Sequence, residues 1–151
     1  MHPGRLELCD GIIRYRIDGA PIWELPLSDV RVIGEMTNDH GPFVDDYSFC
    51  FATDANSWYE GSIYAEGTEE FLKSLATLLR CDLPLRLIGS TDYDSNVLWP
   101  PHLAGRPMFA FIPERPKTWI GWLIGASGNT QWFSDEVLVE LRTQSRTSRC
   151  T

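Results

Sequence analysis

The chain has 151 residues, the size of one ordinary domain, and its 43% hydrophobic and 23% charged residues are typical of a globular protein. Lys and Arg number 13 against 21 Asp and Glu, so the formal net charge is −8. This charge argues against a nucleic acid or an anionic membrane as a partner and, by sign alone, favours a basic protein.

The four cysteines show neither a CxxC motif nor a histidine at ligand spacing: they are Cys9, Cys50, Cys81 and Cys150. We therefore predict reduced and mostly buried thiols, with Cys150 in a loose tail as the exception, and neither a metal nor a cofactor. The opening residues lack the apolar run of a signal peptide, and the sequence contains no stretch of 18 apolar residues. These features predict a cytoplasmic protein.

Two Asp-Gly pairs, at residues 10–11 and 18–19, each separate short runs of strand-like residues. This dipeptide is the strongest local signal for a two-residue hairpin turn. Between the two turns Ile13 and Tyr15 alternate with two arginines, as expected of a strand with one apolar face. The sequence thus predicts a meander of three antiparallel strands.

Three more strands are predicted before the first helix. Residues 30–36 form the fourth, and a loop rich in turn-forming residues follows it at 37–42. Residues 47–53 show the clearest alternation of the chain, with aromatic side chains on one face and small ones on the other. Residues 58–65 form the sixth strand, which leads into the helix.

Residues 67–80 predict an amphipathic helix, because their apolar side chains have the spacing of one buried stripe. The stripe contains Phe71, Leu72, Leu75, Leu78 and Leu79. Thr68 is the predicted N-cap, two glutamates occupy the first turn, and Arg80 lies in the last turn. We expect the stripe to cover the sheet, with Leu78 among its buried residues.

These elements predict an α+β protein: an antiparallel meander of about six strands capped by the helix, with a C-terminal strand-and-helix extension. An opening strand with an Asp-Gly turn, the run WELPLSDV at 23–30, and strands closed by a helix together characterise residues 5–80. In these features the segment resembles pleckstrin-homology-like domains, particularly small bacterial and GRAM-type relatives. The resemblance implies a bent antiparallel sheet and a binding role. The phosphoinositide pocket of some relatives would have only Arg14 and Arg16 as basic candidates, and the acid-rich loops argue against it.

The C-terminal part predicts further strands near residues 85–88, 108–112 and 119–124. A second helix is expected to begin at Ser134 and to bury an apolar face made of Val137, Leu138 and Leu141. We interpret the chain as a single domain, residues 1–151, in three parts: 1–83, an extension at 84–142, and a polar, frayed tail at 143–151. The alternative is a domain boundary near Pro84.

Residues 92–96, with the sequence DYDSN, have the oxygen spacing that begins a calcium-binding loop. The sixth position is Val97, where the loop needs glycine, and the twelfth is Leu103, where it needs glutamate. We therefore predict a solvated turn and no metal site.

The loop after the fourth strand places three carboxylates and an imidazole close together: Asp39, His40, Asp45 and Asp46. A catalytic acid–base pair or a metal site requires such groups to converge. A hairpin loop that keeps its charges in water requires nothing more. The sequence leaves both interpretations open.

No stretch carries a catalytic or cofactor signature, so the first hypothesis is a non-enzymatic cytoplasmic interaction protein (an adaptor, regulatory or immunity-type protein) with a protein partner. Carboxylates around an exposed aromatic would steer and anchor a basic partner. The predicted binding residues are Asp39, Phe43, Asp45 and Asp46. The alternative is a small hydrolase or ligand-binding enzyme that uses these loop carboxylates or those at residues 92–94. The oligomeric state is left open.

Overall fold

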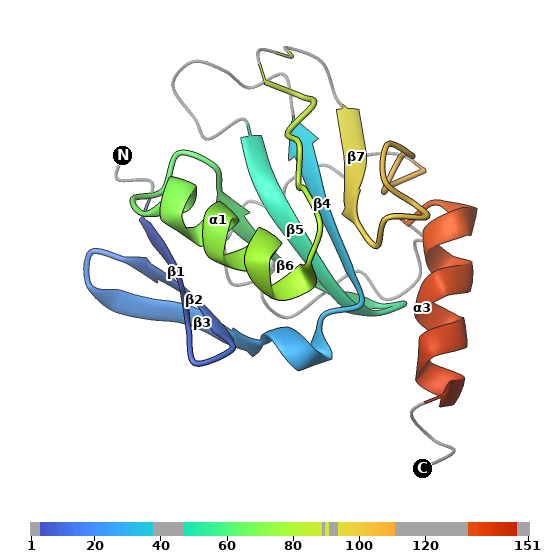
Figure 1. Ribbon diagram of the computed structural model, residues 1–151, viewed down its shortest axis with the longest axis horizontal. Helices are drawn as coiled ribbons and strands as arrows, with labels where there is room; N and C mark the ends of the chain where they lie inside the picture. Colours follow the sequence, from blue (N-terminus) through green and yellow to red (C-terminus); the bar gives the residue numbers. More distant parts are fainter. Residues whose placement is uncertain (1–3, 38–46, 89, 91–93, 111–132, 148–151) are drawn as a thin grey trace.

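The computed structural model describes residues 4–37, 47–88, 90, 94–110 and 133–147, and within them the protein is α+β (Figure 1). Two antiparallel sheets, of three and four strands, are accompanied by two α-helices in these residues. Neither described helix is long and apolar enough to cross a membrane.

The first sheet is the predicted meander, with strand order β1-β2-β3. Its strands are β1 (Arg5–Cys9), β2 (Ile12–Ile17) and β3 (Ala20–Pro26). Both turns place two consecutive residues at positive φ: 54° and 74° at Asp10 and Gly11, and 50° and 78° at Asp18 and Gly19. This is the left-handed geometry of type I′ hairpins, and it confirms the prediction from the Asp-Gly pairs.

The second sheet has the strand order β6-β5-β4-β7. Its strands are β4 (Val32–Thr37), β5 (Tyr47–Asp54), β6 (Ser57–Ser62) and β7 (Asp94–Trp99). The six strands that precede the first helix are therefore divided between two sheets and do not form one continuous meander. The break follows Pro26, where β3 ends and a short 3-10 helix, Leu27–Asp29, redirects the chain.

The second sheet separates two hydrophobic cores. One core lies against the first sheet and α1 (Thr68–Leu79), and its members include Leu6, Ile13, Trp23, Phe49, Phe51, Phe71 and Leu75. The other lies against α3 (Asp135–Thr147), and its members include Val32, Met36, Cys50, Ala52, Met108, Phe133, Val137 and Leu141. β5 contributes to both cores because its alternating side chains are buried on both faces from Tyr47 to Ala52.

The helix α1 differs from its prediction in two features, the N-cap residue and the exposure of Leu78. Its N-cap is Gly67, at φ 79°, while Thr68 is the first helical residue and donates its hydroxyl to the carbonyl of Ala65 at 2.8 Å. Leu75 is fully buried, but Leu78 is 56% exposed. Three residues correspond to 300°, so Leu78 lies about 60° around the helix from Leu75, at the outer edge of the stripe.

After α1 the chain crosses the second sheet without forming the strand predicted at 85–88 (Figure 1). The burial still alternates, with Leu87 inside and Arg86 and Ile88 outside. The backbone N–H of Arg86 donates to the side chain of Glu35 and not to a neighbouring strand. Hence the apolar alternation was correct, whereas the strand inferred from it was wrong.

The helix α3 confirms the prediction for its beginning. The Ser134 hydroxyl accepts from the backbone of Val137 at 3.4 Å, and the three predicted apolar residues of the face are buried. The helix runs to Thr147, past the position where the frayed tail was expected to begin. The predicted strand at 119–124 lies outside the described residues, and of the strand at 108–112 Phe109 forms a single bridge to Phe133.

Of the three described cysteines, Cys50 is buried as predicted, and Cys81 is only partly buried. Cys9 is exposed, contrary to the prediction. It is the last residue of β1, at the edge of the turn, and it shares the outward parity of Arg5 and Glu7.

Candidate functional site

The binding residues predicted from the sequence, Asp39, Phe43, Asp45 and Asp46, lie outside the described residues, as do His40 and Asp92. Their role stays a prediction. The structure does describe the two residues that bracket the acidic segment, because Thr37 and Tyr47 face each other as a cross-strand pair. Thr37 and Tyr47 are therefore held together at one end of the second sheet.

Exposed apolar and acidic side chains occur at this same end of the sheet. Tyr64 is 54% exposed, and its ring meets that of Tyr47 edge to face, with the centroids 6.5 Å apart. Ile88, 73% exposed, follows Leu87, whose backbone reaches the Tyr47 hydroxyl. On the other side of β4, the exposed Asp94 is the cross-strand partner of Thr37. We call Tyr64, Ile88 and Asp94 the sheet-end surface.

Beneath this surface lies a buried carboxylate that the sequence analysis missed. Glu35 on β4 has 0% exposure. Its Oε1 accepts from Asn96 Nδ2 at 2.9 Å and from the backbone N–H of Arg86 at 2.7 Å, and its Oε2 accepts from the hydroxyl of Tyr47. The signal was present in the alternation, because Glu35 shares the inward parity of Ile33.

The environment of Glu35 also affects its tyrosine partner. Burial, and then the hydrogen bond to Glu35, raise the pKa of Tyr47 well above its usual value of 10, so the hydroxyl stays protonated and keeps donating. Three donors occupy most of the acceptor sites of this carboxylate, and its burial keeps it from contact with a dissolved substrate. The arrangement is suited to fastening the segment after α1 to the sheet, and not to proton transfer with a bound molecule.

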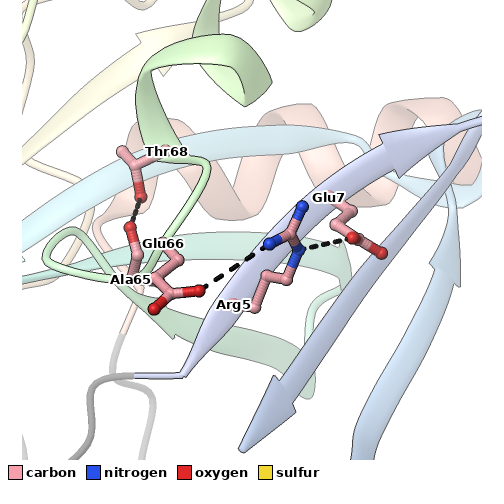
Figure 2. A network of polar contacts seen from close by, with 5 residues as sticks. All are labelled: Arg5, Glu7, Ala65, Glu66 and Thr68. Atoms are coloured by element: carbon pink, nitrogen blue, oxygen red, sulfur yellow. Dashed lines mark hydrogen bonds and ion pairs between the residues drawn. The ribbon is translucent and has the colours of Figure 1, made fainter. Parts of the chain in front are cut away.

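A second polar cluster lies at the start of the first sheet (Figure 2). Arg5 Nε donates to Glu7 Oε1 at 2.6 Å, and Arg5 Nη1 lies 3.7 Å from a carboxylate oxygen of Glu66. The hydrogen bond to Glu7, more than any other contact, raises the pKa of Arg5 above its usual value. Two backbone hydrogen bonds fix Glu66 beside β1: Leu6 N to Glu66 O at 3.0 Å, and Glu66 N to Gly4 O at 2.8 Å.

This cluster forms part of the wall of an open pocket of about 370 Å³. The pocket is lined by Gly4, Arg5, Glu7, Arg16, Asp18, Gly19 and Glu66. It combines two guanidinium groups with three carboxylates, so its surface carries both signs of charge. Across the part of the chain that the structure describes, no group of three or more His, Cys, Asp or Glu side chains is arranged to hold a metal ion.

Comparison with known proteins identified no relative of this chain. No family model matches the chain, and neither a curated protein nor a solved structure is significantly similar to it. The pleckstrin-homology-like resemblance therefore stays a prediction from the sequence pattern.

Proposed function

We propose that the chain is a non-enzymatic cytoplasmic interaction protein, of an adaptor, regulatory or immunity type, that binds a basic protein partner. The partner would dock on the sheet-end surface together with the acidic segment 38–46. One observation carries this proposal: the exposed ring of Tyr64 packs on Tyr47, the first residue of β5, and the exposed Ile88 follows Leu87, whose backbone reaches the Tyr47 hydroxyl.

The chemistry of this end of the molecule suits a protein partner. An exposed aromatic and an exposed aliphatic side chain supply an apolar anchor, and such anchors provide most of the binding energy at interfaces. The carboxylates of Asp94 and of the adjoining acidic segment would attract a basic partner and orient it on approach. The net charge of −8 acts in the same direction at longer range.

The enclosed state of Glu35 argues only against this carboxylate as a catalytic base; the alternative hydrolase would use the loop carboxylates or those at residues 92–94. A general base must be able to reach its substrate directly or through one water molecule. Glu35 is enclosed, and its hydrogen bonds hold a structural segment. A binding role also agrees with the pleckstrin-homology-like resemblance proposed for residues 5–80.

The test compares matched apolar substitutions. Tyr64→Ser with Ile88→Ser removes the anchor, whereas Val139→Ser changes a side chain that is equally open (64% exposed) but belongs to α3. Tagged versions would recover partners from an extract of the source organism at low and at high salt. We expect the double variant to capture at least about tenfold less of a partner than Val139→Ser captures.

A second pair of variants tests the charge. Asp45→Asn with Asp46→Asn should weaken capture of the same partner, and the loss should resemble that caused by raising the salt concentration. Thermal melts establish that each variant is folded. If every variant recovers the same partner at both salt concentrations, the sheet-end surface is not the binding site.

A further inference from the structure

The pocket at the start of the first sheet contains an arginine, Arg16, that has no ion-pair partner among the described residues. Arg16 on β2 lies directly opposite Arg5 on one side and opposite Pro21 on the other. Like charges in directly opposite positions of a sheet are unfavourable. Arg5 is engaged by Glu7 and Glu66, whereas among the described residues no side chain forms an ion pair or hydrogen bond with Arg16.

The neighbouring arginine of the same strand shows what an ordinary pairing looks like. Arg14 shares the outward face with Arg16 but stands between Glu7 and Glu24 in the strand register. Its Nε donates to Glu24 Oε1 at 3.1 Å. The Nε of Arg16, in contrast, is buried and has no hydrogen-bond acceptor within the described chain. An acceptor from outside the chain that reached the guanidinium group would therefore balance the charge of Arg16, whereas the charge of Arg14 is already balanced by Glu24.

A carboxylate of the pocket likewise has no ion-pair partner among the described residues. Asp18, in the turn after β2, lines the pocket together with Arg16 and takes part in no ion pair among the described residues. Its backbone is held at φ 50° by the type I′ turn, which keeps the side chain at the pocket rim. Within the described part of the chain, the pocket thus contains one unpaired cation, Arg16, and one unpaired anion, Asp18. Arg5, beside them, is paired with Glu7 and Glu66.

The signs of these groups select the ligand. A dianion such as phosphate would gain Arg16 but would be repelled by Glu7, Asp18 and Glu66. A simple cation would be attracted by Asp18 but would leave the charge of Arg16 without a partner. A molecule with one carboxylate and one ammonium group satisfies both unpaired charges at once.

We propose that this pocket binds a small zwitterionic ligand of the amino-acid type, with its carboxylate on the Arg16 guanidinium and its ammonium group on the Asp18 carboxylate. The pocket volume of about 370 Å³ accommodates a molecule of that size. This site is distinct from the sheet-end surface, because it lies on the first sheet.

Amide NMR titration of the full chain would test the proposal. The probes are glycine, γ-aminobutyrate and ε-aminocaproate, which separate the two charges by increasing distances, with acetate and methylammonium as single-charge controls. At least one amino acid should shift the amides of Arg16 and Gly19 saturably, at concentrations where neither single-charge probe does so.

Matched variants then assign the two contacts. Arg16→Gln should weaken binding of that amino acid about tenfold or more, while Arg14→Gln on the same strand face leaves it unchanged. Asparagine tolerates the left-handed backbone of the turn. Asp18→Asn should therefore make the amino acid bind no better than acetate, whereas after Asp10→Asn, in the other turn, the amino acid should still bind better than acetate. The proposal is overturned if no amino acid binds better than acetate, or if the matched variants within each pair behave alike.

Discussion

In both the Glu35 network and the Arg5 network carboxylates are bound by neighbouring groups, but the surroundings of the two networks are opposite. Around Glu35 the carboxylate has no exposure and accepts three hydrogen bonds from fixed donors. Around Arg5 the hydrogen bond to Glu7 is short, at 2.6 Å, but the side chain of Arg5 is 55% exposed and that of Glu66 is 61% exposed. Water competes for the second network and not for the first, so short distances alone do not identify the contacts that stabilise the fold.

The largest effect is expected from Glu35→Ala. Removing the carboxylate leaves the donors of Tyr47, Asn96 and Arg86 buried without an acceptor, and this should lower the free energy of unfolding by about 3–5 kcal/mol. Denaturant melts would measure the loss. The control is Glu24→Ala, which removes an exposed carboxylate and should stay within about 0.5 kcal/mol of the parent chain. Equal losses from the two variants would contradict the role given to Glu35.

A smaller effect is expected from Tyr47→Phe, which removes one of the three donors. The loss should be about 1.5–3 kcal/mol at neutral pH, the range for hydrogen bonds to charged groups. The control is Tyr64→Phe, whose ring is mostly exposed and should matter little to stability.

The contribution of Tyr47 to the stability of the fold should depend on pH. Because the pKa of Tyr47 is raised in the folded chain, the unfolded chain releases this proton first, near its usual pKa of 10. The stabilisation is therefore complete below pH 10 and is lost as the pH rises above it. Melts between neutral and strongly alkaline pH should show a steeper decline for the parent chain than for Tyr47→Phe. Parallel curves would show that Tyr47 titrates normally.

The smallest effect is expected from Arg5→Gln. Its ion pairs are open to solvent, so the denaturation midpoint should not change measurably at physiological salt, and little at low salt. A loss as large as that of Tyr47→Phe would mean that the Arg5 network stabilises the fold despite its exposure.

Local features of the fold could be predicted from the sequence because their causes are local. The Asp-Gly pairs specify the backbone of two turns, and the apolar spacing specifies α1 and the face of α3. The division into two sheets could not be predicted. It depends on the path of the chain after Pro26 and on the pairing of β4 with β7, which are about sixty residues apart.

The candidate sites were less accessible from the sequence for a related reason. Glu35 stands out in the alternation of its strand, but its donors come from β5, β7 and the segment after α1. The unpaired state of Arg16 likewise depends on register, because only the alignment with Arg5 and Pro21 shows that no carboxylate lies opposite. Sequence alternation gave both arginines of β2 the same outward face, and it could not separate the paired one from the unpaired one.

The double burial of β5 has a consequence for how the molecule loses its structure. Every side chain from Tyr47 to Ala52 is buried, with Phe49 and Phe51 in one hydrophobic core and Cys50 and Ala52 in the other. If β5 left the sheet, each core would lose one of its walls in the same event. We therefore expect the α1 side and the α3 side to open as one cooperative unit, with hydrogen exchange of the β5 amides occurring only through global unfolding.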